Sequence, residues 1–491
     1  MTPVSRRAWL LAFVVFGLLG TLPLAAQEKN EPEKARDIAG SRDIAGTWSG
    51  TLDLGAVKLR LVVEFKKKDG GGYTGSMDSP DQGAFGMEID EVLLDKSAVK
   101  FTMKKIGGSY AGDLSADAKE IKGTWKQGPL SLPLVLRPGE KAAPPRRPQE
   151  PKPPFPYRAE EVSYDNKDAG IKIAGTLTLP KEGGPFAAVL LITGSGAQNR
   201  DEELLGHKPF LVLADNLTRR GIAVLRVDDR GVGGTTGTPG ASTIEDHAGD
   251  ALAGVAYLKS RTDIDAKKIG LVGHSEGGLV APAAAVRSGD VAFIVLLAGT
   301  GINGEEILYR QGELIALASG ASAEAAARNN ALQKKMFAIV KAEKDDAQAT
   351  AKIEAITAEY VEQLSDEEKK ALEGLEELGN ARVKMILSPW FRHFLTYDPA
   401  PVLKRVKCPV LAINGEKDLQ VDPKQNLPPI EAALKAGGNA DVTLKELPGL
   451  NHLFQTCQSG SPSEYSQIEE TLSEAALKVV GDWIVERAGA K

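Results

Sequence analysis

From residue 159 onward the chain alternates short, almost continuously apolar runs with amphipathic stretches, and this alternation restricts its fold more than any other feature. The apolar runs include "AAVLLITG", "IAVLRVD", "KIGLVGH", "VAFIVLLAG" and "PVLAING". Strands that are buried on both faces need apolar residues at nearly every position, which is typical of a parallel sheet covered by helices. Between two of these runs, "TIEDHAGDALAGVAYLKS" places its apolar residues on one helical stripe. The pattern predicts an α/β fold with a mostly parallel sheet and helices on both faces.

Residues 46–137 have a different pattern, in which short, partly alternating runs are separated by Gly, Asp and Pro. "VKLRLVVEF" and "AVKFTMKKI" resemble strands, whereas "KDGGGY" and "SPDQG" resemble turns. This segment is predicted to be a small antiparallel β domain. Residues 138–158 are rich in proline, which cannot continue a helix or donate to a strand ladder. We therefore expect an extended linker there, followed by the α/β domain at 159–491.

Between about residues 302 and 399 the alternation stops, and the chain becomes rich in Ala, Glu and Lys with helical periodicity. This predicts a helical cap inserted into the α/β domain, with a capping box at "SDEE" starting one of its helices at Ser365. The segment ends in "SPWFRHFLTYDP". Its aromatic side chains Trp390, Phe391 and Phe394 either line a substrate pocket or pack the cap against the main domain.

The first 26 residues join Arg6 and Arg7 to an apolar run that ends in small residues. This order is typical of a secretory signal peptide. Because the apolar run approaches the length of a membrane span, an uncleaved anchor is the alternative. We expect cleavage, export to the periplasm or the extracellular space, no stable membrane insertion afterwards, and a polar tether over residues 27–45.

The composition excludes some classes of protein. A net charge of −6 and an aromatic content of 5% provide neither a basic stripe nor a stacking surface, so we expect no nucleic-acid partner. Cys408 and Cys457, the two cysteines, are too few for a disulfide scaffold or a cysteine-rich metal site. One bridge is conceivable in an oxidising compartment, but the expected topology favours two free thiols. We expect no metal and no cofactor, and the oligomeric state stays open.

The stretch "GLVGHSEGGL" places Ser275 between Gly273 and Gly277, after an apolar run and before a helical pattern. A nucleophile elbow has this arrangement: the serine occupies a strained turn, and small residues on both sides let the strand and the helix approach each other. The amide of Glu276 would then point to the same place as the hydroxyl and stabilise an oxyanion. A glycine-rich turn that holds a serine by chance is the structural alternative. The context favours Ser275 as a nucleophile.

A serine hydroxyl needs a base and an acid that orients the base. Asp418 follows the strand "PVLAIN", and His452 follows "DVTLKELPG". Loops at the carboxyl ends of parallel strands meet at one edge of a sheet, so both side chains are expected beside Ser275. Asp422 and Glu416, in the same loop as Asp418, are the alternative acids.

The other histidines fit this arrangement less well. His274 is adjacent to the serine and cannot readily turn back toward it, whereas His207, His247 and His393 have no matching acid in the sequence. A lone histidine is usually a packing or surface residue. His452 is therefore the expected base.

A second oxyanion amide is expected in the loop after the first central strand, "LLITGSGAQNRDE". Its glycines let the backbone turn toward a reacting carbonyl. The amide of Ser195 is the first candidate and that of Gly196 the second. A phosphate-binding loop is disfavoured because neither a lysine-terminated P-loop nor a full dinucleotide-binding spacing is present.

Taken together, "ITGSG", "DDRGVGGTTG", "GHSEGG", "INGEKDLQV" and "GLNHLFQ" make residues 159–491 resemble the α/β-hydrolase superfamily, and in particular bacterial secreted carboxylesterases of the serine aminopeptidase-like lineage. The resemblance implies a triad of Ser275, Asp418 and His452 and a helical cap. The usual His-Gly of the oxyanion strand is replaced by Thr193-Gly194 in this chain.

These residues predict a serine hydrolase that cleaves small-molecule carboxylic esters, with short acyl chains, through an acyl-enzyme. An exopeptidase with the same triad is the first alternative. It would need a fixed anion to hold the amino terminus of its substrate, and the candidates are Glu202, Glu203, Glu305 and Glu306. A cell-envelope binding protein with a secondary hydrolase activity is the second alternative.

Overall fold

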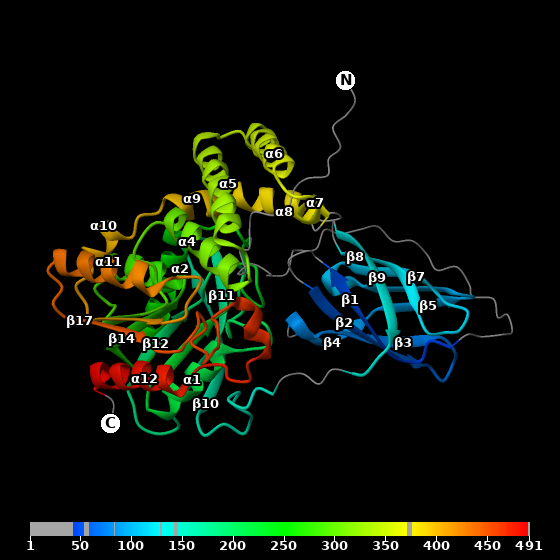
Figure 1. Cartoon of the computed structure of the whole chain (residues 1–491). Coiled ribbons are helices and arrows are strands. Elements are labelled where there is room, and N and C mark those ends of the chain that lie inside the picture. Colours follow the sequence, from blue (N-terminus) through cyan, green and yellow to red (C-terminus); the bar gives the residue numbers. More distant parts are fainter. Residues whose placement is uncertain are drawn as a thin grey trace. The chain divides into compact units, whose positions relative to one another are not determined.

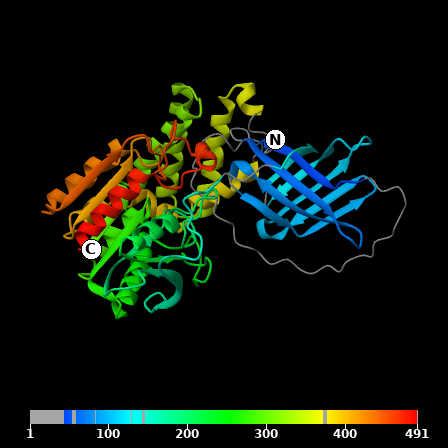
Figure 2. The ribbon, with the colours of Figure 1, turned by 90° about the horizontal axis from the view of Figure 1, so that it is seen from below.

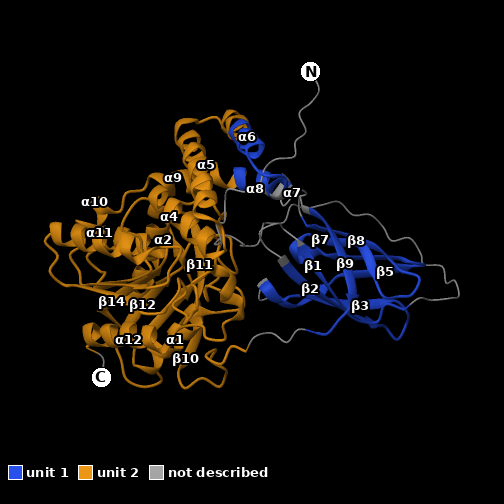
Figure 3. Ribbon diagram, in the orientation of Figure 1, with its two compact units in different colours: residues 1–11, 21–145, 354–383 blue, residues 12–20, 146–353, 384–491 orange. Residues whose placement is uncertain are grey.

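The computed structural model describes residues 43–489 except 54–57, 83, 128–129, 142–145 and 371–375. The predicted signal peptide at 1–26, and the predicted tether as far as residue 42, therefore lie outside the described residues. The described chain forms two compact units, coloured separately in Figure 3. One unit holds residues 43–145 and 354–383, and the other holds residues 146–353 and 384–489.

Antiparallel strands form the first sheet, and they are short, as the alternating pattern and its turns require. The strands are β1 (Gly46–Asp53), β2 (Lys58–Lys67), β3 (Tyr73–Ser79), β4 (Ala84–Ile89), β5 (Glu91–Asp95), β6 (Ala98–Met103), β7 (Gly108–Leu114), β8 (Ile121–Gln127) and β9 (Leu130–Pro138). Their order is β4-β3-β2-β1-β9-β8-β7-β6-β5. Strand β3 also contacts β5, and β4 contacts β6, so the two edges of the sheet approach each other. The sheet therefore curls into a barrel-like shape (Figure 2).

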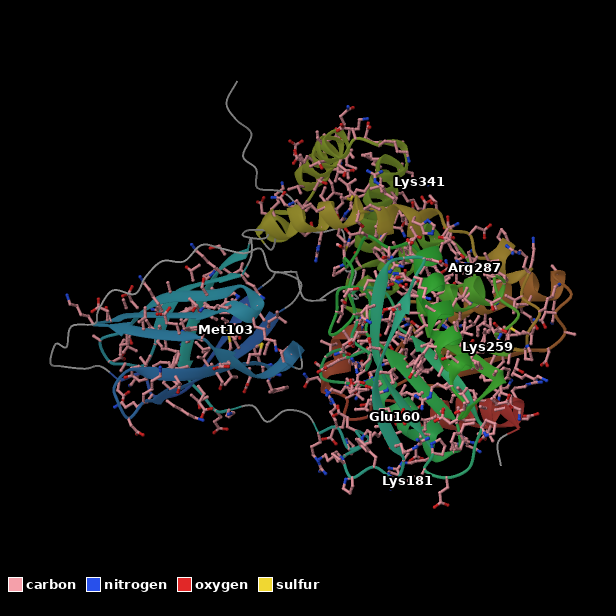
Figure 4. The ribbon with its side chains drawn as sticks, turned by 180° about the vertical axis from the view of Figure 1, so that it is seen from behind. Met103, Glu160, Lys181, Lys259, Arg287 and Lys341 are labelled. Carbon is pink, nitrogen blue, oxygen red and sulfur yellow. The ribbon has the colours of Figure 1, made fainter. Side chains whose placement is uncertain are left out.

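The inner face of this sheet is filled by aromatic and aliphatic side chains. The ring of Phe101 stacks on Tyr110, with centroids 5.1 Å apart, and meets the edge of Phe65 at 5.8 Å. Met103, labelled in Figure 4, is fully buried in the same unit. The hydroxyl of Tyr110 is buried but lies 3.0 Å from the backbone oxygen of Ile121, to which it donates. The alternating pattern of the sequence therefore corresponds to a packed interior.

The second sheet carries the apolar runs that begin after residue 158. Its strands are β10 (Arg158–Asn166), β11 (Ile171–Leu179), β12 (Phe186–Ile192), β13 (Ala223–Val227), β14 (Ile264–His274), β15 (Phe293–Leu297), β16 (Val410–Gly415) and β17 (Val442–Leu447). The order is β10-β11-β13-β12-β14-β15-β16-β17, in which β10 and β11 pair antiparallel and the strands from β13 to β17 run parallel. Every residue of β15 and β16 is buried, which explains their continuous apolar character.

Helices cover both faces of this sheet (Figure 1). They are α1 (Pro209–Arg219), α2 (Ile244–Ser260), α3 (Gly277–Ala285), α11 (Pro423–Ala436) and α12 (Glu474–Ala488). Helices α1 and α12 contact each other, and their apolar side chains share one core cluster with Val189, Val272 and Ile413 of the strands. Helices α2 and α3 pack together. Arg287 after α3 and Lys259 of α2 are labelled in Figure 4. Arg287 donates to the Glu245 carbonyl at 2.8 Å, and Lys259 pairs with Asp290.

The chain between β15 and β16 is helical. Its helices are α4 (Gly304–Ala318), α5 (Ala323–Ala342), α6 (Asp346–Glu362), α7 (Asp366–Lys370), α8 (Glu376–Ile386), α9 (Pro389–Thr396) and α10 (Ala400–Leu403). Side chains of Asn303, Ser322 and Ser388 cap three of them. The predicted capping box also forms, because the Ser365 amide donates to Glu368 at 2.8 Å and the Glu368 amide donates to Ser365.

These observations confirm the predicted fold class: an α/β fold with helices on both faces of a mostly parallel sheet, a helical insertion, and an antiparallel β domain before it. Short 3-10 helices complete the described elements, at Pro80–Gln82, Lys104–Ile106 and Pro462–Gln467. Cys408 and Cys457 are both free, as expected. In the part of the chain that the structure describes, no helix is long and apolar enough to span a membrane.

Candidate active site

Ser275 lies in a tight turn between β14 and α3. Its φ of +52° is in the left-handed region, which costs a residue with a side chain about 1–3 kcal/mol. A Cβ on Gly273 would come within 2.0 Å of the Gly277 carbonyl oxygen, and one on Gly277 within 2.3 Å of the Ile192 oxygen. Both positions therefore require glycine. The elbow geometry expected from the sequence is present.

His452 and Asp418 meet at the carboxyl edge of the same sheet. His452 Nδ1 lies 2.8 Å from Asp418 Oδ2, and the two side chains are 6% and 0% exposed. The amides of Gln420 and Val421 both donate to Asp418 Oδ1 at 2.8 Å. These bonds fix the carboxylate, which in turn orients the imidazole.

The loop that carries His452 also lies against the elbow. The rings of His274 and His452 are 4.9 Å apart between centroids, and His274 Nε2 lies 3.1 Å from the His452 carbonyl oxygen. Among the described residues, the Ser275 hydroxyl and His452 Nε2 make no hydrogen bond. Such contacts are often long in unliganded enzymes and tighten when substrate binds.

The alternative acids serve other parts of the structure. Asp422 accepts the Lys424 amide at 2.9 Å as the N-cap of α11 and pairs with Arg310 at 2.8 Å. Glu416 accepts the Gly449 amide at 2.8 Å. Of the three acids considered, Asp418 is the one that the structure brings to His452.

Two backbone amides remain available near Ser275. In the described part of the chain, the amides of Glu276 and Ser195 donate to no protein acceptor. The amide of Gly194, by contrast, donates to Glu202 Oε1 at 2.7 Å. The expected donors are therefore free, and the neighbouring amide of the oxyanion strand is already engaged.

Buried acidic groups lie close to one another around the elbow, and the local sequence does not predict this arrangement. Asp229 accepts the Gln198 amide at 2.8 Å and the Thr193 hydroxyl at 2.9 Å. Burial raises the pKa of Asp229 to about 8, opposed by these two hydrogen bonds and reinforced by the charges of Glu276 and Glu202. Asp229 belongs to the sequence "DDRG", but no local pattern indicates that its carboxyl group lies beside the elbow.

The neighbouring charged residues of that sequence connect loops. Asp228 accepts both the backbone amide and the guanidinium of Arg200, at 2.9 and 2.7 Å. Arg230 pairs with Asp250 of α2 at 2.6 Å. These charge-assisted bonds tie the loop after β13 to the loop after β12 and to α2.

The three aromatic side chains proposed for a pocket have different surroundings. Phe391 is 2% exposed and meets Phe337 of α5 edge to face, with centroids 5.6 Å apart. Phe394 is also buried and stacks on Trp390 at 5.7 Å. Trp390 is partly exposed, and its Nε1 donates to Glu276 Oε1 at 2.8 Å. The two phenylalanines behave as packing residues, whereas Trp390 links α9 to the residue after Ser275.

The remaining histidines have structural surroundings. His207 is fully buried between Thr471 and the Tyr465 carbonyl, and burial lowers its pKa to about 4. His393 Nε2 lies 3.0 Å from Glu245 Oε2 of α2. That partner lies 148 positions away in the chain and could not be seen from the local sequence. In the described ranges, no cluster of three or more His, Cys, Asp or Glu side chains is placed to hold a metal ion.

The fold and the elbow together define a class of hydrolases built on a mostly parallel sheet. A sequence model described as "Alpha/beta hydrolase family" matches residues 189–464, more than half of the chain. The chain belongs to the alpha/beta hydrolase family.

Similar proteins include esterases. The chain is 28% identical over 339 residues to Esterase EstD from Thermotoga maritima, covering 68% of this chain and 70% of that one. Among solved structures, the Pyrococcus furiosus esterase Pf2001 is 18% identical, with 68% of this chain and 93% of that one covered and a TM-score of 0.40. Est1E from Butyrivibrio proteoclasticus is 19% identical, with coverages of 67% and 99% and a TM-score of 0.38. These TM-scores are low, so the assignment rests on the family match.

Proposed function

We propose that this hydrolase is a serine carboxylesterase that cleaves small-molecule esters with short acyl chains, and that Ser275, Asp418 and His452 form its triad. The 2.8 Å contact between His452 Nδ1 and the buried carboxylate of Asp418, in loops beside the left-handed Ser275, is the observation that carries the proposal. The similarity to Esterase EstD supports the choice of ester chemistry.

In the proposed mechanism, the Ser275 hydroxyl attacks the acyl carbonyl while its proton passes to His452 Nε2. The amides of Glu276 and Ser195 donate to the oxyanion, and the charge of Asp418 stabilises the imidazolium. His452 then gives the proton to the departing alcohol, leaving the acyl group on Ser275. A water molecule, deprotonated by His452, releases the carboxylic acid and restores the serine.

An exopeptidase is the main alternative, and the surroundings of its candidate anions favour the ester. Glu202 already accepts hydrogen bonds from Gly194 and His274, and Glu305 pairs with Lys341 at 2.5 Å. The carboxylate of Glu203 is exposed and accepts from Asn199. A substrate amino group would have to reach the buried Oε2 of Glu202, displace Lys341 from Glu305, or pair with an exposed carboxylate. A pair with an exposed carboxylate contributes little binding energy.

The aromatic side chains of α9 support the proposal of short acyl chains. Phe391 and Phe394 are buried in packing, so Trp390 is the one of the three aromatics that remains partly exposed beside Glu276. A small apolar surface of this kind suits an acyl group of a few carbons.

We also propose the organisation and the destination of the chain. A signal peptide at 1–26 and a tether at 27–45 would precede a β domain at 46–137, a linker at 138–158 and the hydrolase domain at 159–491 with its cap at about 302–399. The exported protein would act in the periplasm or outside the cell. The amino-terminal sequence of the protein recovered from a bacterial periplasm tests this, and a chain that still begins at Met1 contradicts it.

The triad is tested by hydrolysis of p-nitrophenyl acetate. Ser275→Ala should lower kcat by about 10³-fold or more while the protein stays folded. Ser319→Ala is the matched control, because Ser319 is exposed at the end of α4. More than a trace of esterase activity in Ser275→Ala, with Ser319→Ala unchanged, overturns the triad.

Two further assays separate the alternatives. Amino-acyl and dipeptidyl anilides hydrolysed faster than esters of the same acyl group would indicate an exopeptidase. The full-length Ser275→Ala protein, incubated with peptidoglycan or lipid vesicles, tests the binding-protein alternative. No retention on either material is the expected result.

A further inference from the structure

His274 has an acceptor at each of its two ring nitrogens. Nδ1 lies 2.9 Å from Glu202 Oε1, and Nε2 lies 3.1 Å from the carbonyl oxygen of His452. A carbonyl oxygen carries no proton and can only accept. If Glu202 is a carboxylate, it can only accept as well. Both contacts are then hydrogen bonds only when His274 carries a proton on each nitrogen, as an imidazolium.

The buried position of Glu202 supports this charge assignment. Its side chain is 6% exposed, and Oε1 accepts from both His274 and the Gly194 amide. In the described part of the chain, Glu202 Oε2 is buried without a hydrogen-bond partner. A buried carboxylate with one unpartnered oxygen is costly unless a cation lies beside it, and His274 is the group in contact.

The backbone at Glu202 is also held in an unusual conformation. Its φ is +51°, in the left-handed region that a glutamate adopts only at a cost. The Glu202 amide donates to the Asn199 carbonyl oxygen at 2.8 Å and closes a tight turn. This turn directs the Glu202 side chain inward. Backbone strain of this kind persists only where surrounding contacts impose it. One such contact joins Glu202 to the Gly194 amide, in the loop expected to hold the oxyanion.

We propose that Glu202 and His274 form a buried carboxylate–imidazolium pair that positions the oxyanion loop and the loop of the catalytic base around Ser275. The inference rests on the proposed function, because it assigns both residues as positioning residues for that reaction. Glu202 holds the loop after β12 through the Gly194 amide. His274 belongs to the elbow itself and holds the loop after β17 through the backbone of His452.

The electrostatic surroundings agree with this assignment. Burial disfavours a charged His274, but the charge and hydrogen bond of Glu202 and the carbonyl of His452 outweigh it, so the pKa of His274 lies above its usual value. Asp418 adds a smaller contribution in the same direction. Asp229 and Glu276, the remaining acidic groups at the elbow, face the same cluster as Glu202.

The protonation state is tested on the wild-type protein by NMR of ¹⁵N-labelled histidine. The chain has five histidines, and His274→Gln identifies the signal of interest. We expect this ring to show both nitrogens protonated at pH 7.5, in the wild type and in Glu203→Gln. Glu202→Gln should convert it to a neutral tautomer. A neutral His274 in the wild type, or a doubly protonated one in Glu202→Gln, overturns the pair.

Kinetics test the positioning role, with Glu203→Gln as the control because Glu203 is adjacent and exposed. Glu202→Gln keeps an acceptor for Gly194 and should lower kcat by about 10- to 100-fold, as expected for misplaced reacting groups, with KM within about twofold. An unchanged kcat in Glu202→Gln overturns the proposal even where Ser275→Ala abolishes activity. An active Ser275→Ala instead refutes the proposed function and leaves the NMR result to decide on the ion pair.

Discussion

The replacement Asp418→Asn offers the sharpest test of how the proposed triad is oriented. Asp418 Oδ1 is held by two backbone amides, at 2.8 Å each, so the oxygen of an asparagine would take that position. The amide nitrogen would then face His452 Nδ1, where Oδ2 lies at 2.8 Å in the native protein. A donor at that place turns His452 Nδ1 into an acceptor and puts the ring proton on Nε2.

That tautomer cannot accept the Ser275 proton. The expected loss in kcat is about 10⁴-fold, which corresponds to about 5 kcal/mol of transition-state stabilisation. Steady-state hydrolysis of p-nitrophenyl acetate measures this loss, and circular dichroism shows whether the fold is retained. We expect KM to change little, because the side chain of Asp418 is 0% exposed.

Asp422→Asn is the matched control in the same loop. It weakens the ion pair with Arg310 and keeps an N-cap for α11, so it should cost about 1 kcal/mol or less in stability and leave kcat unchanged. An Asp418→Asn enzyme within tenfold of wild type, or an equal loss in Asp422→Asn, would refute the reasoning.

Two further predictions concern the groups around the elbow. Trp390→Phe removes the 2.8 Å hydrogen bond to Glu276 but keeps an aromatic ring stacked on Phe394. The value of kcat/KM, measured with esters of increasing acyl length, should fall by about 3- to 30-fold without loss of fold. An unchanged kcat/KM for every ester would exclude a role for this hydrogen bond. The pKa of Asp229 is raised to about 8, so in the folded protein Asp229 keeps a proton that the unfolded chain loses near pH 4. The free energy of unfolding should therefore fall as pH rises between those two values. Asp229→Asn should make the stability depend less on pH, and thermal unfolding of both proteins at pH 5 and pH 8.5 measures this. An equal change in stability with pH in the wild type and in Asp229→Asn contradicts the assignment.

The local sequence was sufficient for the features that short-range physics determines. Continuous apolar runs identified strands such as β15 and β16 because burial on both faces leaves no polar position. The glycines around Ser275 predicted the elbow because a Cβ at either Gly273 or Gly277 has no space. Asp418 and His452 could be placed together because strand ends of a parallel sheet share one edge.

The features that escaped prediction depend on contacts between distant positions. Glu202 and His274 are 72 positions apart in the sequence, and Trp390 and Glu276 are 114 apart. His274 is adjacent to Ser275 in the chain, but its hydrogen-bonding partners come from two other loops. No local pattern carries this information, since burial of a charge is decided only when the loops assemble.

The central claim is that Ser275 carries the acyl group, and intact-protein mass spectrometry tests it most directly. The wild-type enzyme, quenched in acid within the first turnovers of a p-nitrophenyl ester, should gain the mass of one acyl group. Peptide mapping should place that group on Ser275, and Ser275→Ala should gain nothing. An acyl group mapped to another residue, or an equal gain in Ser275→Ala, would contradict the account.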